Sequence, residues 1–186
     1  NHDPGVWDMF KTILTWNDDL VGGKFHKLHW PQPVEFPVVD DMPFWQRRLL
    51  VNISCNKTSM DPRAQYAERL DTARWVGRNM PGHFELYGMG WEDEAEQVDH
   101  KWDVYPRFRF GLAYENMLAP GYVTEKIFDI MRAGAVPVYW GAPNITDYVP
   151  KGCFVDRREF HSIRKLALYL RSMQEPEWQM HREFIR

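Results

Sequence analysis

From residue 47 onward, short apolar runs alternate with segments whose apolar residues recur at helical spacing. An apolar run of about four to eight residues is typical of a strand, whereas apolar positions three and four apart indicate a helix. Residues 49–54 and 135–140 are apolar runs of strand length, 84–87 and 108–114 alternate as in a strand, and 153–155 is read as a further short strand. The segments with helical spacing are residues 63–76, 125–133 and 159–173.

The ends of two predicted helices carry local signals. Pro62 suits the first turn of the helix over 63–76, where a missing backbone N–H costs nothing. Thr124 can cap the helix over 125–133, and Gly134 can end it. Both helices are therefore expected to begin directly after a loop that leaves a strand.

The order strand-helix-strand-strand-helix-strand-strand-helix predicts an α/β fold with a mostly parallel sheet and helices on both faces. In such sheets, ligands bind at the carboxyl ends of the strands, in the loops that lead into helices. The loops after residues 54 and 114 are therefore the first places to look for a site.

Residues 1–46 differ from the rest of the chain in their glycine and proline pattern. They contain the flexible pair Gly22-Gly23 and then four prolines within thirteen residues, ending at Pro43. Proline at that density favours an extended linker over a helix or a central strand. We expect a boundary here, with the α/β domain at 47–174 and a tail or return helix at 175–186.

Composition narrows the class of protein. The net charge of -3 argues against nucleic acid as a partner, because phosphate binding normally shows as a basic excess. The aromatic fraction of 15% suits a protein that packs rings on sugars, although additional core aromatics explain it equally well. Cys55 and Cys153 show no disulfide or metal pattern and are expected to be free.

The loop from Tyr114 to Lys126 carries the strongest chemical signal. Unpaired N–H groups at the start of a helix favour an anion, and Lys126 adds a full positive charge to the first turn. A lysine is unfavourable there for the helix itself, which indicates a bound phosphate; a solvated surface lysine is the alternative. Glu125 could accept hydrogen bonds from a ribose diol, or could simply be an acid that favours the helix start.

Two further residues fit the same chemistry. Arg63 stands at the start of the first predicted helix, so it could converge with Lys126 on one pyrophosphate. Tyr122 could pack on a nucleotide or bond a phosphate oxygen, although it could equally be a core residue. The acidic run 92–94 lacks the setting of a metal site, and no glycine-rich phosphate loop is present.

Three segments, residues 108–116, 121–127 and 133–143, resemble the signature of the α-1,3/α-1,4-fucosyltransferases of glycosyltransferase family 10. The most specific part is the Tyr-Val-Thr-Glu-Lys block at 122–126. The resemblance implies the donor-binding half of a GT-B enzyme, with a Rossmann-like domain, GDP-fucose as donor, inverting transfer to a glycan hydroxyl and no metal or other cofactor for donor binding. Residues 1–46 then resemble the end of an acceptor-side domain and its hinge.

The resemblance also assigns roles to individual residues. Arg63 and Lys126 match the pyrophosphate-binding pair, Glu125 matches the acid on the ribose hydroxyls, and Asn116 and Tyr122 match residues near the phosphates. The family's general base lies on the N-terminal acceptor domain, which this sequence largely lacks. The catalytic base is therefore left unassigned.

Some expectations stay open. Tyr114 and Met117 depart from the family's Phe-Glu-Asn-Ser segment, and Glu115 is a weak substitute for the missing base. Two alternative functions are open: a GT-B transferase that uses another GDP-sugar, and a non-catalytic sugar-nucleotide-binding domain. The expected partners are GDP-fucose, an oligosaccharide acceptor and the acceptor domain. The protein is expected in the cytoplasm or at a membrane if it is bacterial, and at the Golgi membrane if it is eukaryotic.

Overall fold

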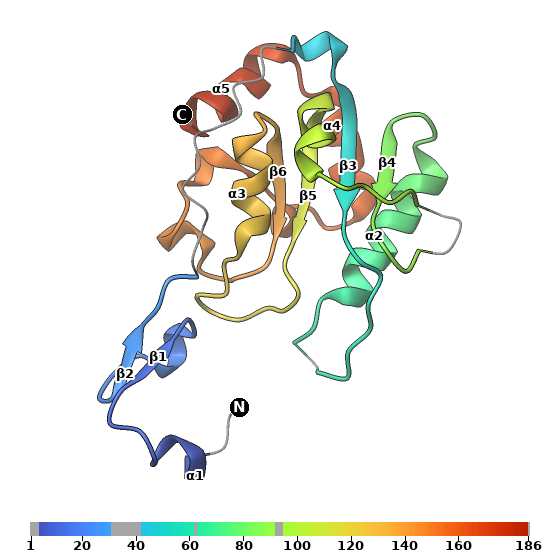
Figure 1. The fold of residues 1–186 in the computed structure, drawn as a ribbon. Helices are drawn as coiled ribbons and strands as arrows, with labels where there is room; N and C mark the ends of the chain where they lie inside the picture. Colours follow the sequence, from blue (N-terminus) through green and yellow to red (C-terminus); the bar gives the residue numbers. More distant parts are fainter. Residues whose placement is uncertain (1–3, 31–41, 62, 92–94, 186) are drawn as a thin grey trace.

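The computed structural model describes residues 4–30, 42–61, 63–91 and 95–185. Its centre is a five-stranded parallel sheet with the strand order β4-β3-β5-β6-β7 (Figure 1). The strands are β3 (Arg48–Ile53), β4 (Phe84–Tyr87), β5 (Phe108–Tyr114), β6 (Val136–Trp140) and β7 (Val155–Asp156). The predicted parallel sheet is confirmed.

Helices cover both faces of this sheet, as predicted. On one face, α3 (Glu125–Arg132) packs Ile127 and Ile130 against Phe108 and Tyr139. Gly111 in β5 permits that close approach, because an added Cβ would lie 2.8 Å from Cδ1 of Ile130.

The other face carries a second core. Val76 from α2 (Tyr66–Asn79) and Leu166 from α4 (Ile163–Ser172) pack there against Phe110 and Leu112. Burying two such apolar layers is the main stabilising contribution in a fold of this kind. At their carboxyl ends, the central strands lead into loops.

The C-terminal residues form the return helix, α5 (Glu175–Ile185). Its Trp178 is fully buried in the second core, and the indole N–H donates to Arg109 O at 2.9 Å. This helix therefore packs as part of the α/β body.

Two helices begin later than the sequence predicted. The helix expected from residue 63 begins at Tyr66, because residues 63–65 pair instead with the loop after β5: Gln65 N donates to Asn116 O, and Leu118 N donates to Arg63 O, each at 2.9 Å. Pro62 lies outside the described residues. The helix expected from residue 159 begins at Ile163, one residue after its cap.

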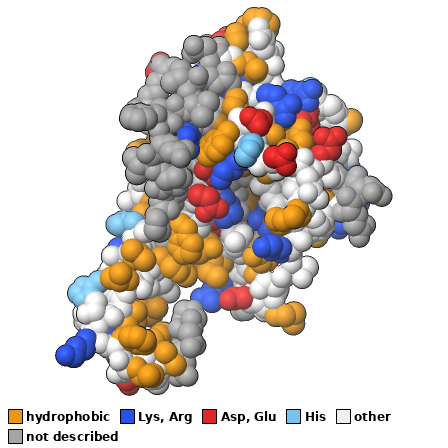
Figure 2. Space-filling view, viewed as in Figure 1, with side chains coloured by type: hydrophobic (Ala, Val, Ile, Leu, Met, Phe, Trp, Pro, Cys, Tyr) orange, Lys and Arg blue, Asp and Glu red, His pale blue; other side chains and the backbone are white. Residues whose placement is uncertain are grey.

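The N-terminal segment, residues 4–30, has its own small sheet. A short helix, α1 (Pro4–Trp7), precedes two parallel strands, β1 (Ile13–Thr15) and β2 (Phe25–Lys27). Figure 2 shows hydrophobic side chains gathered over this part of the surface. The exposed large hydrophobic residues of this segment are Met9, Phe10, Leu14, Val21, Leu28 and Trp30.

Polar contacts join the N-terminal segment to the α/β body. Asp18 Oδ2 accepts hydrogen bonds from Tyr148 Oη at 2.6 Å and from Asn144 Nδ2 at 2.8 Å, and Lys27 Nζ donates to Tyr148 Oη at 2.5 Å. The first three prolines of the predicted linker fall within 31–41, outside the described residues. Among the helices that are described, none is both long and apolar enough to cross a membrane.

Candidate nucleotide-sugar site

The candidate site lies where β5 and β6 end and α3 begins. The chain leaves β5 at Glu115, whose backbone N–H donates to Trp140 O at 2.8 Å, so the ends of the two strands are tied together. It then passes through residues 116–123 and enters α3 at Glu125. The sequence predicted a phosphate site at this junction, and the fold brings Glu115, Glu125 and Lys126 together there.

Glu115 is the buried centre of the junction, with no exposed side-chain surface. Its Oε1 accepts the backbone N–H of Thr124 at 2.8 Å, and its Oε2 accepts the hydroxyl of Thr124 at 2.7 Å. Oε2 also accepts a hydrogen bond from Lys126 Nζ at 3.1 Å. Both oxygens therefore face the first turn of α3, an arrangement that suits positioning and not proton abstraction from an acceptor.

Lys126 is held at the edge of this buried cluster. Its Nζ lies 2.9 Å from Thr124 Oγ1 and 3.6 Å from Glu125 Oε1, and its side chain is 23% exposed. Lys126 therefore has a buried counter-ion, Glu115, and a side chain that is still partly exposed to solvent. That geometry excludes the solvated surface lysine and leaves the ammonium able to reach a ligand.

The pKa values follow from burial and from these contacts. Burial alone would lower the pKa of Lys126, but the negative charges of Glu115 and Glu125 outweigh it and raise the pKa above its usual value. Burial raises the pKa of Glu115, against the opposing effects of Lys126 and Thr124. The lysine thus keeps its charge throughout the physiological range.

Thr124 occupies the cap position of α3 but does not cap it. Its hydroxyl is turned toward Glu115 and makes no capping hydrogen bond, which differs from the role predicted for it. The first N–H groups of a helix have no intrahelical partner, and they carry partial positive charge. Beside them, Glu125 is 42% exposed at the first position of α3, where it is free to meet a ligand hydroxyl.

Asn116 is held by a residue that the sequence reasoning missed. Arg69 of α2 is only 5% exposed, and its guanidinium donates to Asn116 Oδ1 at 3.4 Å and to Cys55 O at 3.2 Å. It also lies over the ring of Tyr66, 4.9 Å from the centroid. An arginine on the apolar stripe that includes Tyr66 and Ala73 was the available signal, since arginine is rarely buried without partners.

Arg63 lies beside the loop but is not aimed at Lys126. Its guanidinium pairs with Asp61 at 2.8 Å, and its side chain is 42% exposed. The backbone of Arg63 accepts a hydrogen bond from Leu118, which places it next to the turn that follows Asn116. Asp61 thus occupies Nε and Nη2 of the guanidinium, and the pyrophosphate clamp of Arg63 and Lys126 stays a prediction.

Comparison with known protein families shows to which family the chain belongs. The family described as "Glycosyltransferase family 10 (fucosyltransferase) C-term" matches residues 46–185, which is most of the chain. The chain belongs to glycosyltransferase family 10. The match covers the five-stranded sheet, the junction around Glu115 and the helix α5.

Several curated family members are similar to part of the chain. An α-(1,4)-fucosyltransferase of Arabidopsis thaliana is 39% identical over 43% of this chain and 20% of its own length. A mouse α-(1,3)-fucosyltransferase 7 is 44% identical over 39% of this chain and 19% of its own length. A GDP-fucose protein O-fucosyltransferase 3 of Xenopus laevis is 38% identical over 42% of this chain and 19% of its own length. The matched region is thus about a fifth of each relative.

Solved structures agree on the fold. An α1,3-fucosyltransferase crystallised with GDP-fucose has a TM-score of 0.60 at 21% identity, and the match covers 73% of this chain and 38% of that one. The glycosyltransferase TarM has a TM-score of 0.51 at 14% identity, covering 96% of this chain and 40% of that one. This chain therefore has the α/β architecture of a GT-B glycosyltransferase domain.

In this family 10 chain, Tyr122 connects the junction to the N-terminal segment. Its ring lies 4.9 Å from that of Trp16 and 6.0 Å from that of Trp30, both in edge-on contact. Burial raises the pKa of the Tyr122 phenol, and the charge of Lys126 acts in the opposite direction. Tyr122 is thus a partly buried packing residue close to Lys126, a position from which its hydroxyl could also meet a ligand.

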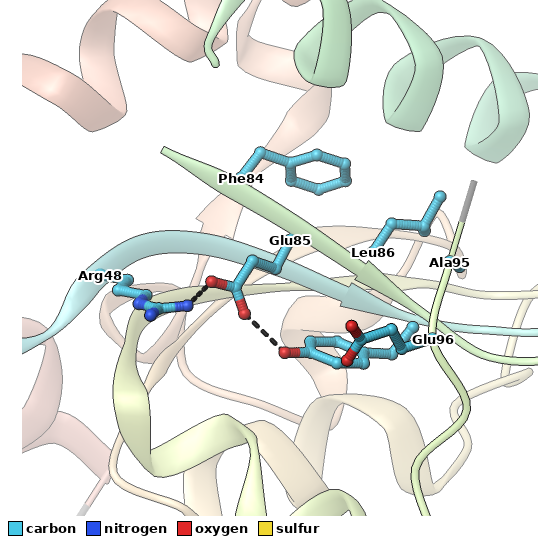
Figure 3. A pocket seen from close by; sticks show the side chains of 7 residues that line it. Arg48, Phe84, Glu85, Leu86, Ala95 and Glu96 are labelled. Atoms are coloured by element: carbon cyan, nitrogen blue, oxygen red, sulfur yellow. Dashed lines mark hydrogen bonds and ion pairs between the residues drawn. The ribbon is translucent and has the colours of Figure 1, made fainter. Parts of the chain in front are cut away.

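A hollow lies at the edge strand β4, lined by Arg48, Glu85 and Glu96 among others (Figure 3). Arg48 pairs there with Glu85, which also accepts the hydroxyl of Tyr87 at 2.6 Å. Arg48 and Glu85 thus satisfy each other, and β4 is separated from β5 by β3. Within the described ranges, no group of three His, Cys, Asp or Glu side chains is placed to hold a metal ion.

Proposed function

We propose that this chain binds GDP-fucose and stabilises the departing GDP in a fucosyltransferase reaction. The diphosphate would lie at the first turn of α3, on the unpaired N–H groups and the ammonium of Lys126. Glu125 would accept hydrogen bonds from the ribose hydroxyls, and Asn116 and Tyr122 would flank the phosphates. Family membership supports the donor class, since the curated relatives are fucosyltransferases.

One observation carries the proposal: Lys126, partly exposed and paired with the buried Glu115, lies in the first turn of α3. A helix amino terminus favours anions, and a fixed ammonium strengthens that preference. Stabilising the charge that develops on a leaving diphosphate is the electrostatic part of an inverting transfer. The chain therefore has the residues for the leaving-group side of the reaction.

Donor specificity is tested by calorimetric titration of the chain with GDP-fucose, GDP-mannose and UDP-galactose. The expected order is GDP-fucose tightest and UDP-galactose weakest. Tighter binding of UDP-galactose would contradict the guanine assignment. Equal binding of the two GDP-sugars would favour a GT-B transferase with another donor.

We propose further that donor binding needs no metal ion, because Lys126 and the start of α3 already supply positive charge to the diphosphate. Titration with GDP in the presence of EDTA is expected to give the same affinity as titration with Mg²⁺. A loss of binding in EDTA would show that a cation completes the site.

The acceptor is proposed to be a hydroxyl of a glycan of the β-galactoside or N-acetylglucosamine type. A protein hydroxyl is the second candidate, because GDP-fucose protein O-fucosyltransferases are among the relatives. Transfer assays with the longest natural form of the protein, on N-acetyllactosamine and on folded protein acceptors, separate the two. Tight donor binding with no transfer to either would favour a non-catalytic sugar-nucleotide-binding role.

The N-terminal segment is proposed to belong with an acceptor-side domain. It has its own sheet, separate from the five strands of the α/β body, and several exposed apolar side chains. An exposed apolar surface of this kind is typical of a contact face. A general base for the acceptor hydroxyl would then come from that domain, because Glu115 is fully occupied within the junction.

A further inference from the structure

A buried carboxylate is the least expected feature beside a site for a diphosphate. Glu115 puts negative charge directly behind Lys126, where it should repel phosphate. It is nevertheless fully buried, at an energetic cost that only fixed partners can offset. Such a group needs a structural or functional reason.

The contacts of Glu115 give that reason. The three hydrogen bonds that its carboxylate accepts come from Thr124 N–H, Thr124 Oγ1–H and Lys126 Nζ, all in the entry to α3. Thr124 Oγ1 in turn accepts a hydrogen bond from Lys126 Nζ at 2.9 Å. One side chain therefore fixes both the direction of the lysine and the position of the residue that precedes the helix.

Packing fixes Glu115 as tightly as its hydrogen bonds do. A Cβ on Gly141 would lie 2.5 Å from Cγ of Glu115 and 2.4 Å from the hydroxyl of Tyr139. That hydroxyl is itself held, because it accepts the N–H of Ala142 at 2.9 Å. The turn after β6 thus closes over the carboxylate and prevents it from swinging away from α3.

We infer that Glu115 is a positioning residue that orients Lys126 and the start of α3 toward the diphosphate of the donor. The inference rests on the proposed function and adds a residue to it. Its reason is preorganisation: a lysine already held in place loses less side-chain freedom when it binds. The cost of ordering a lysine side chain is thereby met during folding and not during binding.

The substitution Glu115→Gln tests this with little change in shape. A glutamine has one oxygen and one NH₂, so it cannot accept from all three donors, and its NH₂ would face a donor. We expect GDP to bind about three- to tenfold more weakly. An unchanged or tighter affinity would overturn the inference, because it would show that the carboxylate acts only as a nearby negative charge.

A double-mutant cycle separates positioning from general damage to the fold. If Glu115 acts through Lys126, Glu115→Gln should weaken GDP binding in the natural chain and have little effect in a chain that already carries Lys126→Ala. An equal loss in both backgrounds would contradict action through the lysine. Failure of the unaltered chain to bind GDP would overturn the proposed function and the inference with it.

A second pair of variants covers the case in which Glu115→Gln does not fold. Thr124→Ser keeps the hydroxyl that links Glu115 and Lys126, whereas Thr124→Val removes it at similar size. GDP affinity should be close to that of the natural chain in the serine variant and reduced in the valine variant. Equal affinities for the two variants would contradict the inference.

The pH dependence supplies a readout that a purely structural role would not change. The ionisable groups that act on this pair are Glu125, Tyr122, Tyr139 and Arg69. Glutamine resembles the protonated carboxyl, so the advantage of the natural chain over Glu115→Gln should shrink as the pH falls through the raised pKa of Glu115. The ratio of the two affinities, measured from neutral pH down to the lowest pH at which both chains stay folded, cancels the titration of GDP itself. A constant ratio would oppose the inference.

Discussion

The helices α3 and α4 begin with the same residue types but use them differently. Each has a hydroxyl residue at its cap and a lysine within the first turn. In α4, Ser162 Oγ accepts the N–H of Lys165 at 3.2 Å, and Lys165 is exposed. In α3, the hydroxyl of Thr124 donates to Glu115, and Lys126 Nζ donates to that same hydroxyl.

The difference lies in the cap residue: Ser162 satisfies an N–H group of its own helix, whereas the hydroxyl of Thr124 bonds Glu115. A capping side chain satisfies an N–H group that would otherwise need an outside acceptor. At α3 a buried carboxylate holds the cap residue instead, so the N–H groups of the first turn are left for an anion. Three substitution experiments and one pH titration test this difference between the starts of α3 and α4.

Replacement of the two lysines should give the largest contrast. Lys126→Ala is expected to weaken GDP binding by about tenfold to a hundredfold, because a charge-assisted hydrogen bond to phosphate contributes roughly 1.5–3 kcal/mol. Lys165→Ala, the matched control at α4, should leave the affinity unchanged. Calorimetric titration measures both, and similar affinities for the two variants would remove the basis of the contrast.

A methyl group at Gly141 should damage the α3 junction from behind. Gly141→Ala places a Cβ against Glu115 and Tyr139, and overpacking of this kind costs about 1–3 kcal/mol. We expect lower stability in urea unfolding and weaker GDP binding in the same variant. The control is Gly77→Ala in α2, where the nearest atom is 3.8 Å away and alanine should stabilise the helix by roughly 0.5–1 kcal/mol.

Removal of the ordinary cap should affect stability alone. Ser162→Ala is expected to cost about 1 kcal/mol of unfolding free energy, since it leaves an N–H of α4 without its acceptor. GDP affinity should be unaltered, because α4 has no part in the site. A change in affinity in this variant would mean that helix starts are coupled through the sheet.

The smallest effect expected is that of alkaline pH on GDP binding. The pKa of Lys126 in the folded chain is raised above its usual value, so the ammonium that would meet the diphosphate keeps its charge until the pH reaches that higher value. Affinity should therefore stay level from pH 7 to pH 9. A decline across that range would indicate that the ammonium loses its proton earlier than its two acidic neighbours allow.

Much of the fold could be predicted because its signals are local. The strands over 84–87 and 108–114 have the bounds predicted for them, since each segment shows the alternation typical of a strand. The helix α3 also begins where predicted, at Glu125. The start of α2 was misplaced because residues 63–65 pair with a loop about fifty positions away, and no local pattern records such pairing.

The site was predictable in its location but only partly in its contacts. Lys126 and Glu125 stood out because their charges follow a strand-to-helix loop. Arg69 did not, since its contact with Asn116 spans 47 residues and forms only when α2 packs beside β5. Glu115 was recognised as an acid near the site, but its burial and its three donors arise from tertiary packing. Sequence patterns therefore predicted where a phosphate would bind, whereas the residues packed behind that place became visible only in the fold.

The most direct test of the central claim is a crystal structure of this chain with GDP-fucose. We predict that the diphosphate lies at the first turn of α3, within hydrogen-bond distance of Lys126 Nζ, and that Lys126 keeps its contact with Glu115. A diphosphate bound elsewhere, such as in the hollow at β4, or a Lys126 turned away from it, would contradict the account.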